Sequence, residues 1–364
     1  MSKKMINLLC LLCLLAGGAQ ADFLDYGLYW FGKGQASEKF TGPGNRYYDD
    51  SRPTLIFVHG WQLGTSKDNY WRPNFNFLNN VPAHGYDIDE AAAWIDQGWN
   101  VGIYYWNQFG DELEVKDAEA KMWTATGLRG MRYRQSDGRY STLQAPNKSI
   151  SELMTDAVAE ALKDNRNGYL LLHGHSLGSQ LAISVAYQLT RRAEQGIVPA
   201  SLIPERLVLS DPFWSKYGKS YLNGAWTGEV SRAYARYLID YYDIALEMTR
   251  SSGICDLWIG DCNDEMTRMA AFQRLRFWYS DWWEIDQKHI MAYDWWMLSR
   301  TYPAPLEVDY NLEPTGEVAL SASTSDQRIK AMMGGQYEWD QVDGLYTPIP
   351  ADDRFEVIEL SVWP

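Results

Sequence analysis

The sequence predicts an α/β protein whose central sheet is mostly parallel and carries helices on both faces. Strand-like apolar runs alternate with helix-like segments along the chain, which is the pattern of successive βαβ units. No internal repeat, low-complexity tract or Gly/Ser/Pro-rich linker divides the chain after its first residues. In such sheets a functional site lies beyond the carboxyl ends of the strands. The residues that follow each predicted strand are therefore the first candidates for function.

The first residues are expected to lie outside this fold. Two lysines precede an almost entirely apolar run over residues 6–15, and residues 19–21 have the small-x-small form of a cleavage site. The run is about ten residues, which is short for a membrane span. We interpret residues 1–21 as a secretory signal peptide and residues 22–364 as one domain of a secreted or periplasmic protein. An uncleaved N-terminal anchor is the alternative, and its apolar run would be longer.

The charge and the cysteine content restrict the partners. Residues 1–21 contain two of the 33 Lys and Arg and none of the 47 Asp and Glu, so the rest of the chain has a formal charge of −16. This balance argues against nucleic acid or an anionic membrane as an electrostatic partner. Beyond residue 21 only Cys255 and Cys262 remain, and in an oxidising compartment they are expected to form a local disulfide. No metal is predicted there, because no further Cys or His is close enough in sequence to complete the ligands.

Each predicted element has its own sequence signal. Pro53 precedes the first strand, and Ser149 with Glu152 three residues later has the form of a capping box at a helix start. Apolar residues keep a helical spacing after Ser149, and again after Leu177 up to a candidate C-cap at Gly196. The predicted order is strand 54–58, helix 87–97, strand 99–106, helix 150–162, strand 169–173, helix 177–192 and strand 206–210.

A serine lies where the third strand meets a helix, in the run Gly174-His175-Ser176-Leu177-Gly178. A serine hydroxyl is a weak nucleophile until a base removes its proton. A sharp strand-to-helix turn would hold the Ser176 hydroxyl above the sheet and aim the N–H groups of the helix start at a reacting carbonyl. Such a turn needs small flanking residues, and Gly174 and Gly178 provide them. We predict that Ser176 is a nucleophile; an ordinary glycine-bounded turn with an incidental serine is the alternative.

His289 is the predicted base. Serine elbows of this kind occur in chains with the order nucleophile, acid, base. Only one of the five histidines follows Ser176 in the sequence; they are His59, His84, His173, His175 and His289. The rings of His173 and His175 are expected to point away from the hydroxyl, because one is on the strand and the other in the elbow. His59 is expected to support the turn after the first strand. A surface histidine ahead of a helix over 290–299 is the alternative for His289.

Asp211 is the predicted acid. It follows the strand over 206–210, and Pro212 stops that strand. A carboxylate at this place could hold the base in the correct tautomer and stabilise the imidazolium. Asp243, Asp264 and Asp281 also fall between Ser176 and His289 and remain alternatives.

A tetrahedral intermediate needs N–H donors for its oxyanion. We predict the backbone N–H of Leu177, which follows the nucleophile, and the backbone N–H of Trp61, which lies in the turn after the first strand. Gly60 would let the backbone approach the reacting carbonyl closely. A simple tight exit from the strand at His59-Gly60 is the alternative.

These motifs resemble a known superfamily. In this order, Ile56-Phe57-Val58-His59-Gly60-Trp61, Gly174-His175-Ser176-Leu177-Gly178, Ser210-Asp211-Pro212 and His289 look like the α/β-hydrolases, and most closely the pancreatic-lipase-like family. The resemblance covers roughly residues 50–300. It implies an α/β-hydrolase fold, Ser176, Asp211 and His289 as a catalytic triad, and Trp61 and Leu177 as oxyanion donors.

The resemblance also implies a disulfide-bounded lid between acid and base. Cys255 and Cys262 fall in that interval but enclose a shorter loop. The chain departs from the family at Ser179, where alanine is usual, and by lacking its other disulfides. Residues 301–364 are too short for the family's C-terminal lipid-binding sandwich and have no predicted role.

Residues 213–275 are too long for a simple connection, so we predict a cap or lid there. They contain many aromatic residues and a helical segment over 234–248. Several of the 17 Trp cluster further on, over 277–283 and 295–296, and such clusters are typical of an apolar pocket or rim.

The predicted function is that of a secreted serine carboxylic-ester hydrolase, lipase-like or esterase-like, acting on hydrophobic or lipid esters. A lipid interface is a candidate partner; no cofactor, metal, nucleic acid or protein partner is predicted. A thioesterase, a cutinase-like polyester hydrolase and a peptidase on the same fold are alternatives, because one triad serves all of them. A non-catalytic binding protein that uses the aromatic pocket is the alternative from another class.

Overall fold

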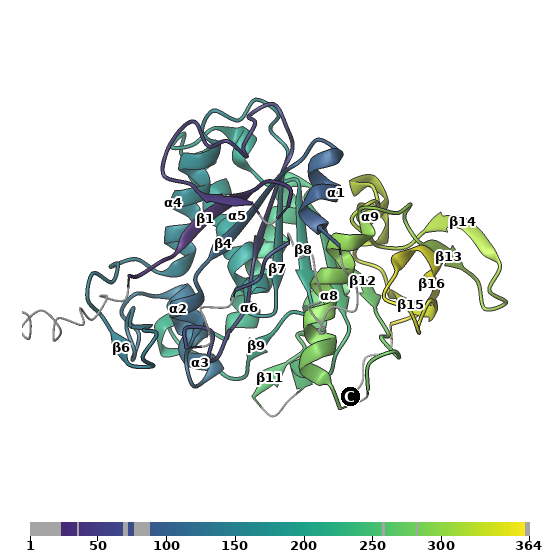
Figure 1. The fold of residues 1–364 in the computed structure, drawn as a ribbon. Coiled ribbons are helices and arrows are strands. Elements are labelled where there is room, and N and C mark those ends of the chain that lie inside the picture. Colours follow the sequence, from purple (N-terminus) through teal and green to yellow (C-terminus); the bar gives the residue numbers. More distant parts are fainter. Residues whose placement is uncertain are drawn as a thin grey trace, which may run out of the picture.

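The computed structural model describes residues 23–34, 36–67, 72–75, 88–256, 259–281 and 283–360. The predicted signal peptide, residues 1–21, lies outside these ranges, and so does His84. The described chain is built on one large sheet that has helices on both faces (Figure 1). The α/β fold class predicted from the alternation of strands and helices is therefore confirmed.

Twelve strands of the described chain form the central sheet. They are β1 (Gly27–Phe31), β2 (Ser37–Lys39), β3 (Thr54–Val58), β4 (Asn100–Tyr105), β7 (Leu170–His175), β8 (Arg206–Ser210), β10 (Ala245–Arg250), β12 (Ala271–Arg274), β13 (Leu306–Val308), β14 (Pro314–Val318), β15 (Tyr337–Asp343) and β16 (Arg354–Glu359). Their order across the sheet is β14-β13-β16-β15-β12-β10-β8-β7-β3-β4-β1-β2.

The middle of the sheet is parallel. The strands from β4 through β3, β7, β8, β10 and β12 to β15 pair parallel with one another. At one edge β1 and β2 are antiparallel, and at the other β16 returns antiparallel to β15. Two further pairs lie apart from this sheet: β5 (Tyr133–Arg134) with β6 (Tyr140–Ser141), and β9 (Trp214–Ser215) with β11 (Gly260–Asp261).

Two buried clusters cover the two faces of the sheet. The α-helices are α1 (Glu90–Asp96), α2 (Asn107–Gly110), α3 (Val115–Trp123), α4 (Ile150–Leu162), α5 (Gly178–Glu194), α6 (Thr227–Tyr242), α7 (Asp264–Met269), α8 (Ile285–Ser299) and α9 (Asp326–Met332). Along β3, Ile56 and Val58 pack in the cluster that holds α3 to α6. Leu55 and Phe57 point to the other face and pack in the cluster that holds α1, α8 and α9, as the two-residue repeat of a strand requires.

Several predicted boundaries agree with the structure. β3 and β8 have the predicted bounds, and the Ser149–Glu152 capping box opens α4. β7 continues two residues past the predicted end to His175. α8 begins at Ile285, so His289 lies within this helix and not ahead of it.

The stretch predicted as a cap or lid, residues 213–275, contributes β10 and β12 to the central sheet. Only the parts of residues 213–275 outside β10 and β12 could cover the site. A cap or lid there remains a prediction. The helix predicted over 234–248 was placed wrongly at its end: α6 stops at Tyr242, where Asp243 takes a left-handed conformation with φ 50°, and β10 follows. Beyond residue 301, the described chain forms β13 to β16 and α9, which extend the sheet.

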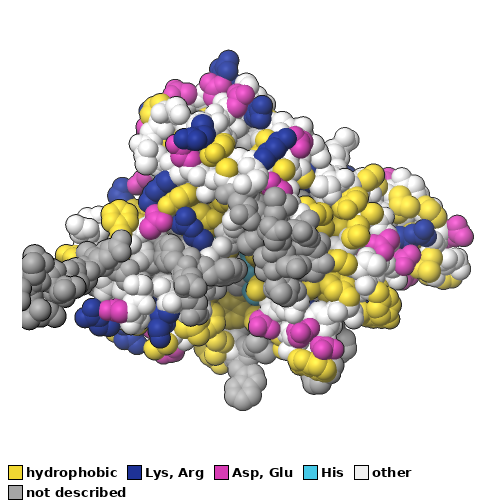
Figure 2. Space-filling view, viewed as in Figure 1, with side chains coloured by type: hydrophobic (Ala, Val, Ile, Leu, Met, Phe, Trp, Pro, Cys, Tyr) yellow, Lys and Arg dark blue, Asp and Glu magenta, His cyan; other side chains and the backbone are white. Residues whose placement is uncertain are grey.

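None of the helices in the described part of the chain has the length and apolar character needed to cross a membrane. The face seen in Figure 2 is hollowed near its centre, where part of a histidine side chain is visible beside hydrophobic side chains.

Candidate active site

Ser176 is at a sharp turn between β7 and α5. It has φ 56°, in the left-handed region that non-glycine residues seldom adopt. Backbone hydrogen bonds hold it there: its N–H donates to the carbonyl of Ser210 at 3.1 Å, and its carbonyl accepts from the N–H of Phe213 at 3.3 Å. Because both partners flank Asp211, the turn is fixed against the end of β8.

The two elbow glycines leave no room for a side chain. A methyl group on Gly174 would lie 2.3 Å from the carbonyl oxygen of Gly178. A methyl group on Gly178 would lie 2.2 Å from the carbonyl oxygen of Val58. The reason given from the sequence for these glycines, close approach of backbone segments, is therefore visible in the packing. Ser179 donates a hydrogen bond to the carbonyl of Gly174 at 3.0 Å, which closes the elbow further.

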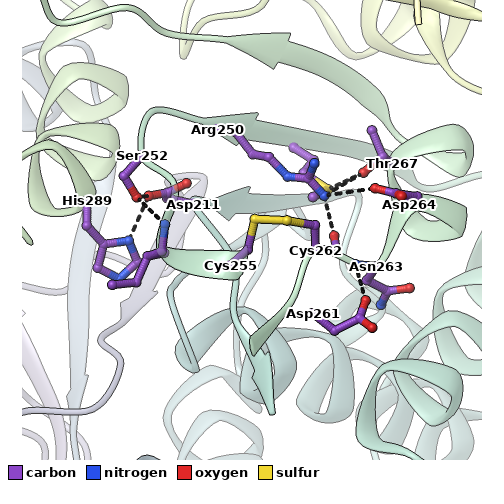
Figure 3. Close-up of a disulfide and its surroundings, with 12 residues drawn as sticks. Asp211, Arg250, Ser252, Cys255, Asp261, Cys262, Asn263, Asp264, Thr267 and His289 are labelled. Carbon is purple, nitrogen blue, oxygen red and sulfur yellow. Dashed lines mark hydrogen bonds and ion pairs between the residues drawn. A yellow bond between two sulfur atoms is a disulfide. The ribbon is translucent and has the colours of Figure 1, made fainter. Parts of the chain in front are cut away.

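Asp211 and His289 lie together, although 78 residues separate them. Nδ1 of His289, in the second turn of α8, donates to Oδ2 of Asp211 at 2.7 Å (Figure 3). The Asp211 side chain is 1% exposed and that of His289 12%, so little water competes for this hydrogen bond. The bond fixes the tautomer with the proton on Nδ1 and leaves Nε2 free to accept a proton.

The alternative acids are elsewhere. Asp243 forms an ion pair with Lys330 at 2.9 Å, and its side chain is 87% exposed. Asp264 lies 3.8 Å from Arg250, and Asp281 is exposed ahead of α8. Among the described residues, none of the three contacts His289. The geometry therefore favours Asp211 as the acid.

The turn after β3 lies against the elbow. A methyl group on Gly60 would be 2.6 Å from Cβ of Ser176, so this backbone can approach only as glycine. The indole N–H of Trp61 donates to the carbonyl of Glu112 at 2.7 Å, which holds this residue in place. Within the described chain, the backbone N–H groups of Trp61 and Leu177 have no hydrogen-bond acceptor, as oxyanion donors require.

His59 supports the same turn. Its Nδ1 donates to the carbonyl of Gly60 at 2.9 Å, and its Nε2 accepts from the N–H of Trp106 at 3.1 Å. Complete burial lowers the pKa of His59 to about 4. The ring therefore stays neutral at physiological pH and fixes the carbonyl of Gly60.

His173 and His175 have different surroundings. His173 is buried under α8, with Nε2 2.7 Å from the hydroxyl of Ser210. His175 lies against the candidate base, with 4.3 Å between the two ring centroids, and its Nε2 donates to the carbonyl of His289 at 2.9 Å. Burial pushes the pKa of both rings well below the ordinary value. The contact of His175 with His289 was not predicted, because the two residues are 114 positions apart and no local pattern relates them.

A cavity of about 370 Å³ opens over these residues. Ser176, His289 and Trp61 line it, and most of its remaining wall is apolar; the apolar residues are Leu63, Pro73, Val115, Phe213, Ile254, Ile259 and Ile290. Asp286, an exposed residue of the first turn of α8, is the acidic residue among those that line it. Within the described ranges no group of three His, Cys, Asp or Glu side chains could hold a metal ion. The cavity can therefore hold an apolar group beside a serine, with a histidine and a carboxylate arranged behind it.

The predicted disulfide between Cys255 and Cys262 is present beside this site (Figure 3). Sequence reasoning missed Ser251 and Ser252, which precede the disulfide and contact Asp211. A prediction of β10 next to β8 would have placed them there, because both residues follow directly after β10.

The order of the strands, with the Ser176 elbow after β7 and Asp211 after β8, is that of the α/β-hydrolase fold. No protein-family model matches the sequence, and no curated protein does. Solved structures of hydrolases show distant similarity. LpqC, a poly(3-hydroxybutyrate) depolymerase from Bordetella parapertussis, is 11% identical over 67% of this chain and 70% of its own, with a TM-score of 0.31.

Two further structures are similar at the same level. A thioesterase domain from the curacin biosynthetic pathway is 17% identical over 52% of this chain, with a TM-score of 0.23, and the match spans 46% of that domain's own chain. A thermostable esterase from Pseudomonas putida is 14% identical over 60% of this chain and 53% of its own, with a TM-score of 0.19. Similarities this distant concern the fold at most, and the fold assignment rests on the sheet itself.

Proposed function

We propose that this protein is a serine carboxylic-ester hydrolase that acts on hydrophobic esters through an acyl-enzyme. One observation carries the proposal: Ser176, on a strained elbow, shares an apolar cavity with His289, whose other ring nitrogen is hydrogen-bonded to buried Asp211. A nucleophile, a base and a group that orients the base are the three parts that acyl transfer by serine needs.

In the proposed reaction Oγ of Ser176 attacks the ester carbonyl carbon while its proton passes to Nε2 of His289. Asp211 keeps the Nδ1–H hydrogen bond and stabilises the imidazolium. The oxyanion accepts hydrogen bonds from the N–H groups of Trp61 and Leu177. The alcohol leaves with the proton from Nε2, and the acyl group stays on Ser176. Water then repeats the sequence and releases the acid.

The walls of the cavity support a hydrophobic acyl or alcohol group as the part that is bound. Leu63 and Ile259 line the cavity and are 51% and 57% exposed, so the apolar surface continues to the mouth. An extended peptide would need backbone hydrogen-bond partners, and the mostly apolar wall offers few. We therefore favour a hydrophobic or lipid ester over a peptide as the substrate. Thioester hydrolysis would use the same groups.

Hydrolysis of p-nitrophenyl esters from short to long acyl chains tests the proposal. We expect the wild type to turn over these esters, and Ser176→Ala to lose this activity. Ser184→Ala, at a buried serine further along α5, is the matched control and should keep it. Equal activity in Ser176→Ala would remove Ser176 as the nucleophile. No turnover by the folded wild type would indicate a thioesterase, a peptidase or a binding protein.

We further propose that the protein works outside the cytoplasm. The Cys255–Cys262 disulfide supports this, because such bonds persist in oxidising compartments. The pattern of residues 1–21 supports it too. Mass spectrometry of the protein from the extracytoplasmic fraction of its native host should find a chain that begins near residue 22. A chain that retains residues 1–21 would contradict a cleaved signal peptide, and a protein found only in the cytoplasm would contradict the proposal.

A further inference from the structure

Two serines after β10 contact the candidate acid. The backbone N–H of Ser251 donates to Oδ1 of Asp211 at 3.3 Å. The hydroxyl of Ser252 donates to Oδ2, the same oxygen that accepts from Nδ1 of His289 (Figure 3). Both carboxylate oxygens are therefore held by this segment, and the carboxylate cannot rotate without losing a donor.

The same segment reaches the helix that carries the candidate base. The hydroxyl of Ser251 donates to the carbonyl of Lys288 at 2.7 Å, directly before His289. On the other side, His175 donates to the carbonyl of His289. Ser251 therefore connects α8 to this loop, and the next residue of the loop, Ser252, bonds to Asp211. Acid and base are connected through two adjacent serines as well as through their own hydrogen bond.

The orientation of the Ser252 hydroxyl is determined by its neighbours. Its oxygen accepts a hydrogen bond from the N–H of Ile254 at 3.2 Å, so its proton is directed to Asp211. The loop itself is fixed at both ends. The disulfide joins Cys255 to Cys262, and the buried Arg250 side chain donates to the carbonyl of Cys262 and to Oγ1 of Thr267.

We infer that Ser252, together with Ser251, is a positioning residue that holds the Asp211 carboxylate against His289. The inference rests on the proposed function for its effect on turnover, but the contacts themselves do not depend on it. Ser252 does not line the cavity, so it acts through Asp211 and not on the substrate. A charge-assisted hydrogen bond is roughly twice as strong as a neutral one, which makes this donor a large part of what orients the carboxylate.

Ser252→Ala tests the inference, with Ser252→Thr as the variant that restores a hydroxyl. Losing one charge-assisted donor should lower kcat roughly 10-fold with KM almost unchanged. The acid limb of the pH profile of kcat/KM should move to higher pH. With one hydrogen-bond donor fewer, the carboxylate stabilises the imidazolium more strongly. The titratable groups around His289 are Asp211, His175 and three further residues that line the same cavity, His59, Asp286 and Tyr293. The substitution changes none of them.

A second readout does not need turnover. The Nδ1–H proton of His289 should give a low-field proton NMR resonance in the wild type, because it is hydrogen-bonded to a buried carboxylate. Ser252→Ala should shift or broaden this resonance through faster exchange with water, and Ser252→Thr should restore it. Ser323→Ala, which removes another serine hydroxyl bonded to backbone carbonyls, should leave both the resonance and kcat unchanged.

Unchanged kcat, pH profile and resonance in Ser252→Ala would overturn the inference. An equal loss of kcat in Ser323→Ala would also overturn it, since the effect would then be general destabilisation. Should Ser252→Ala fail to fold, Ser251→Ala removes only the bond to Lys288, and the same readouts should change by a smaller amount. A wild type that hydrolyses nothing would contradict the proposed function, while the resonance would still decide the positioning role.

Discussion

Ser176 and Asp211 share an unusual backbone conformation. Their φ values are 56° and 41°, and each is the first residue after a parallel strand, β7 and β8 respectively. A non-glycine residue in this region costs about 1–3 kcal/mol and persists only where its surroundings enforce it. Here the N–H of Asp211 donates to the carbonyl of Thr249 at 2.8 Å, and the N–H of Ser176 to that of Ser210. The turn at Ser176 is therefore held by the end of β8, and the turn at Asp211 by the end of β10.

Replacing the carboxylate at position 211 should stop turnover without disturbing the fold. Asp211→Asn keeps the size of the side chain but can present an amide to Nδ1 of His289, which favours the wrong tautomer. We expect kcat to fall by about four orders of magnitude, measured on the best p-nitrophenyl ester. Near-full activity would contradict the assignment of Asp211 as the acid.

A single methyl group at the elbow should have a large effect. Gly178→Ala would place Cβ 2.2 Å from the carbonyl oxygen of Val58, and backbone on both sides would have to move. We expect a loss of more than about 3 kcal/mol in the free energy of unfolding and no measurable esterase activity.

Urea unfolding and ester hydrolysis check this together. Gly335→Ala is the matched control, because the nearest atoms to its new Cβ are at 3.7 Å. The steric argument fails if Gly178→Ala is as stable and active as the control.

At the scale of elements, the loop between β10 and β12 links the disulfide to the site. Ile254 and Ile259 line the cavity, and the disulfide residues Cys255 and Cys262 bracket most of the stretch between them. The segment that restrains Asp211 and the segment that forms part of the cavity wall therefore belong to one cross-linked loop.

Removing that cross-link should affect both stability and activity. The two cysteines are seven residues apart, and closing a loop of this size restricts the unfolded chain by about 2 kcal/mol. We expect Cys255→Ser/Cys262→Ser to lose about that much in urea unfolding, with a higher KM for long acyl chains because the cavity wall loosens. The reduced wild type should behave like the double variant. Identical unfolding of oxidised and reduced wild type would contradict this account.

The elements whose bounds were predicted correctly are those that their own residues specify. β3 and β8 are short apolar runs next to a proline, and they have the predicted bounds. β10 and β12 were not predicted as strands and fell within the predicted lid region, residues 213–275. They contain charged and polar residues such as Glu247 and Gln273. These residues bond to distant partners: one carboxylate oxygen of Glu247 to Arg206, and the Gln273 amide to the backbone of Leu320. Such pairing cannot be read from local pattern.

The residues of the candidate site divide in the same way into those that local sequence predicts and those that it does not. Ser176 and its glycines form a local motif with one physical use, and His289 followed by elimination. Ser252 is one of two serines in an ordinary loop. It gains its role only because β10 lies beside β8 in the sheet.

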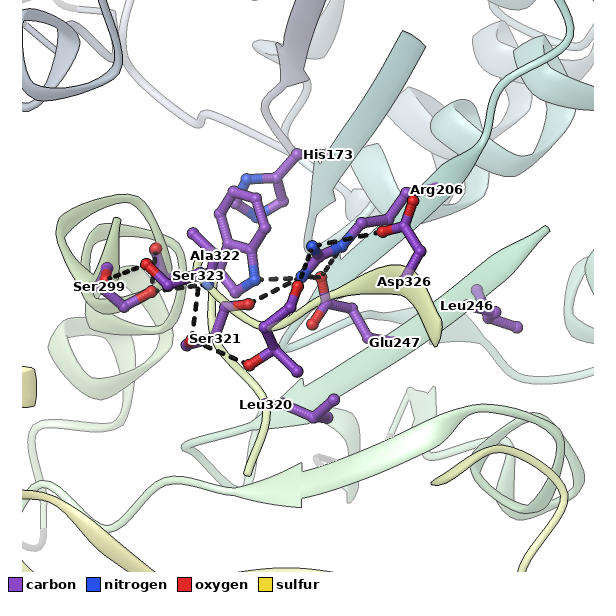
Figure 4. Close-up of polar contacts among 12 residues, drawn as sticks. His173, Arg206, Leu246, Glu247, Ser299, Leu320, Ser321, Ala322, Ser323 and Asp326 are labelled. Atoms are coloured by element: carbon purple, nitrogen blue, oxygen red, sulfur yellow. Dashed lines mark hydrogen bonds and ion pairs between the residues drawn. The ribbon is translucent and has the colours of Figure 1, made fainter. Parts of the chain in front are cut away.

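Across the whole molecule, the described residues 301–360 belong to the same fold as the site. Arg206 is 3% exposed, and its guanidinium donates to Glu247 on β10 and to the carbonyls of Ser321 and Thr324 (Figure 4). These contacts join β8, which ends directly before Asp211, to the segment before α9. The C-terminal part therefore supports the sheet beneath the candidate site.

Buried ionisable groups make the stability of the fold depend on pH in two directions. Burial raises the pKa of Glu247 and of Asp353 to about 7, so these carboxyls favour the fold while protonated, and that contribution is lost as the pH rises from about 4 to about 7. Burial lowers the pKa of His59, His173 and His175. Their contribution has the opposite sign, because protonation below about 6.5 favours the unfolded chain.

Asp353 allows one of these contributions to be isolated. Its carboxylate accepts from the indole N–H of Trp295 at 2.6 Å and from the amide of Gln341 at 2.8 Å, and within the described chain no cation pairs with it. Asp353→Asn can keep the bond to Trp295 but cannot ionise. Relative to the wild type, we expect the variant to gain on the order of 3 kcal/mol in the free energy of unfolding between pH 5 and pH 8. Urea unfolding of both proteins at the two pH values measures this. A difference between variant and wild type that does not change with pH would mean that Asp353 is ionised throughout, and that the buried surroundings of this carboxyl do not disfavour its charge.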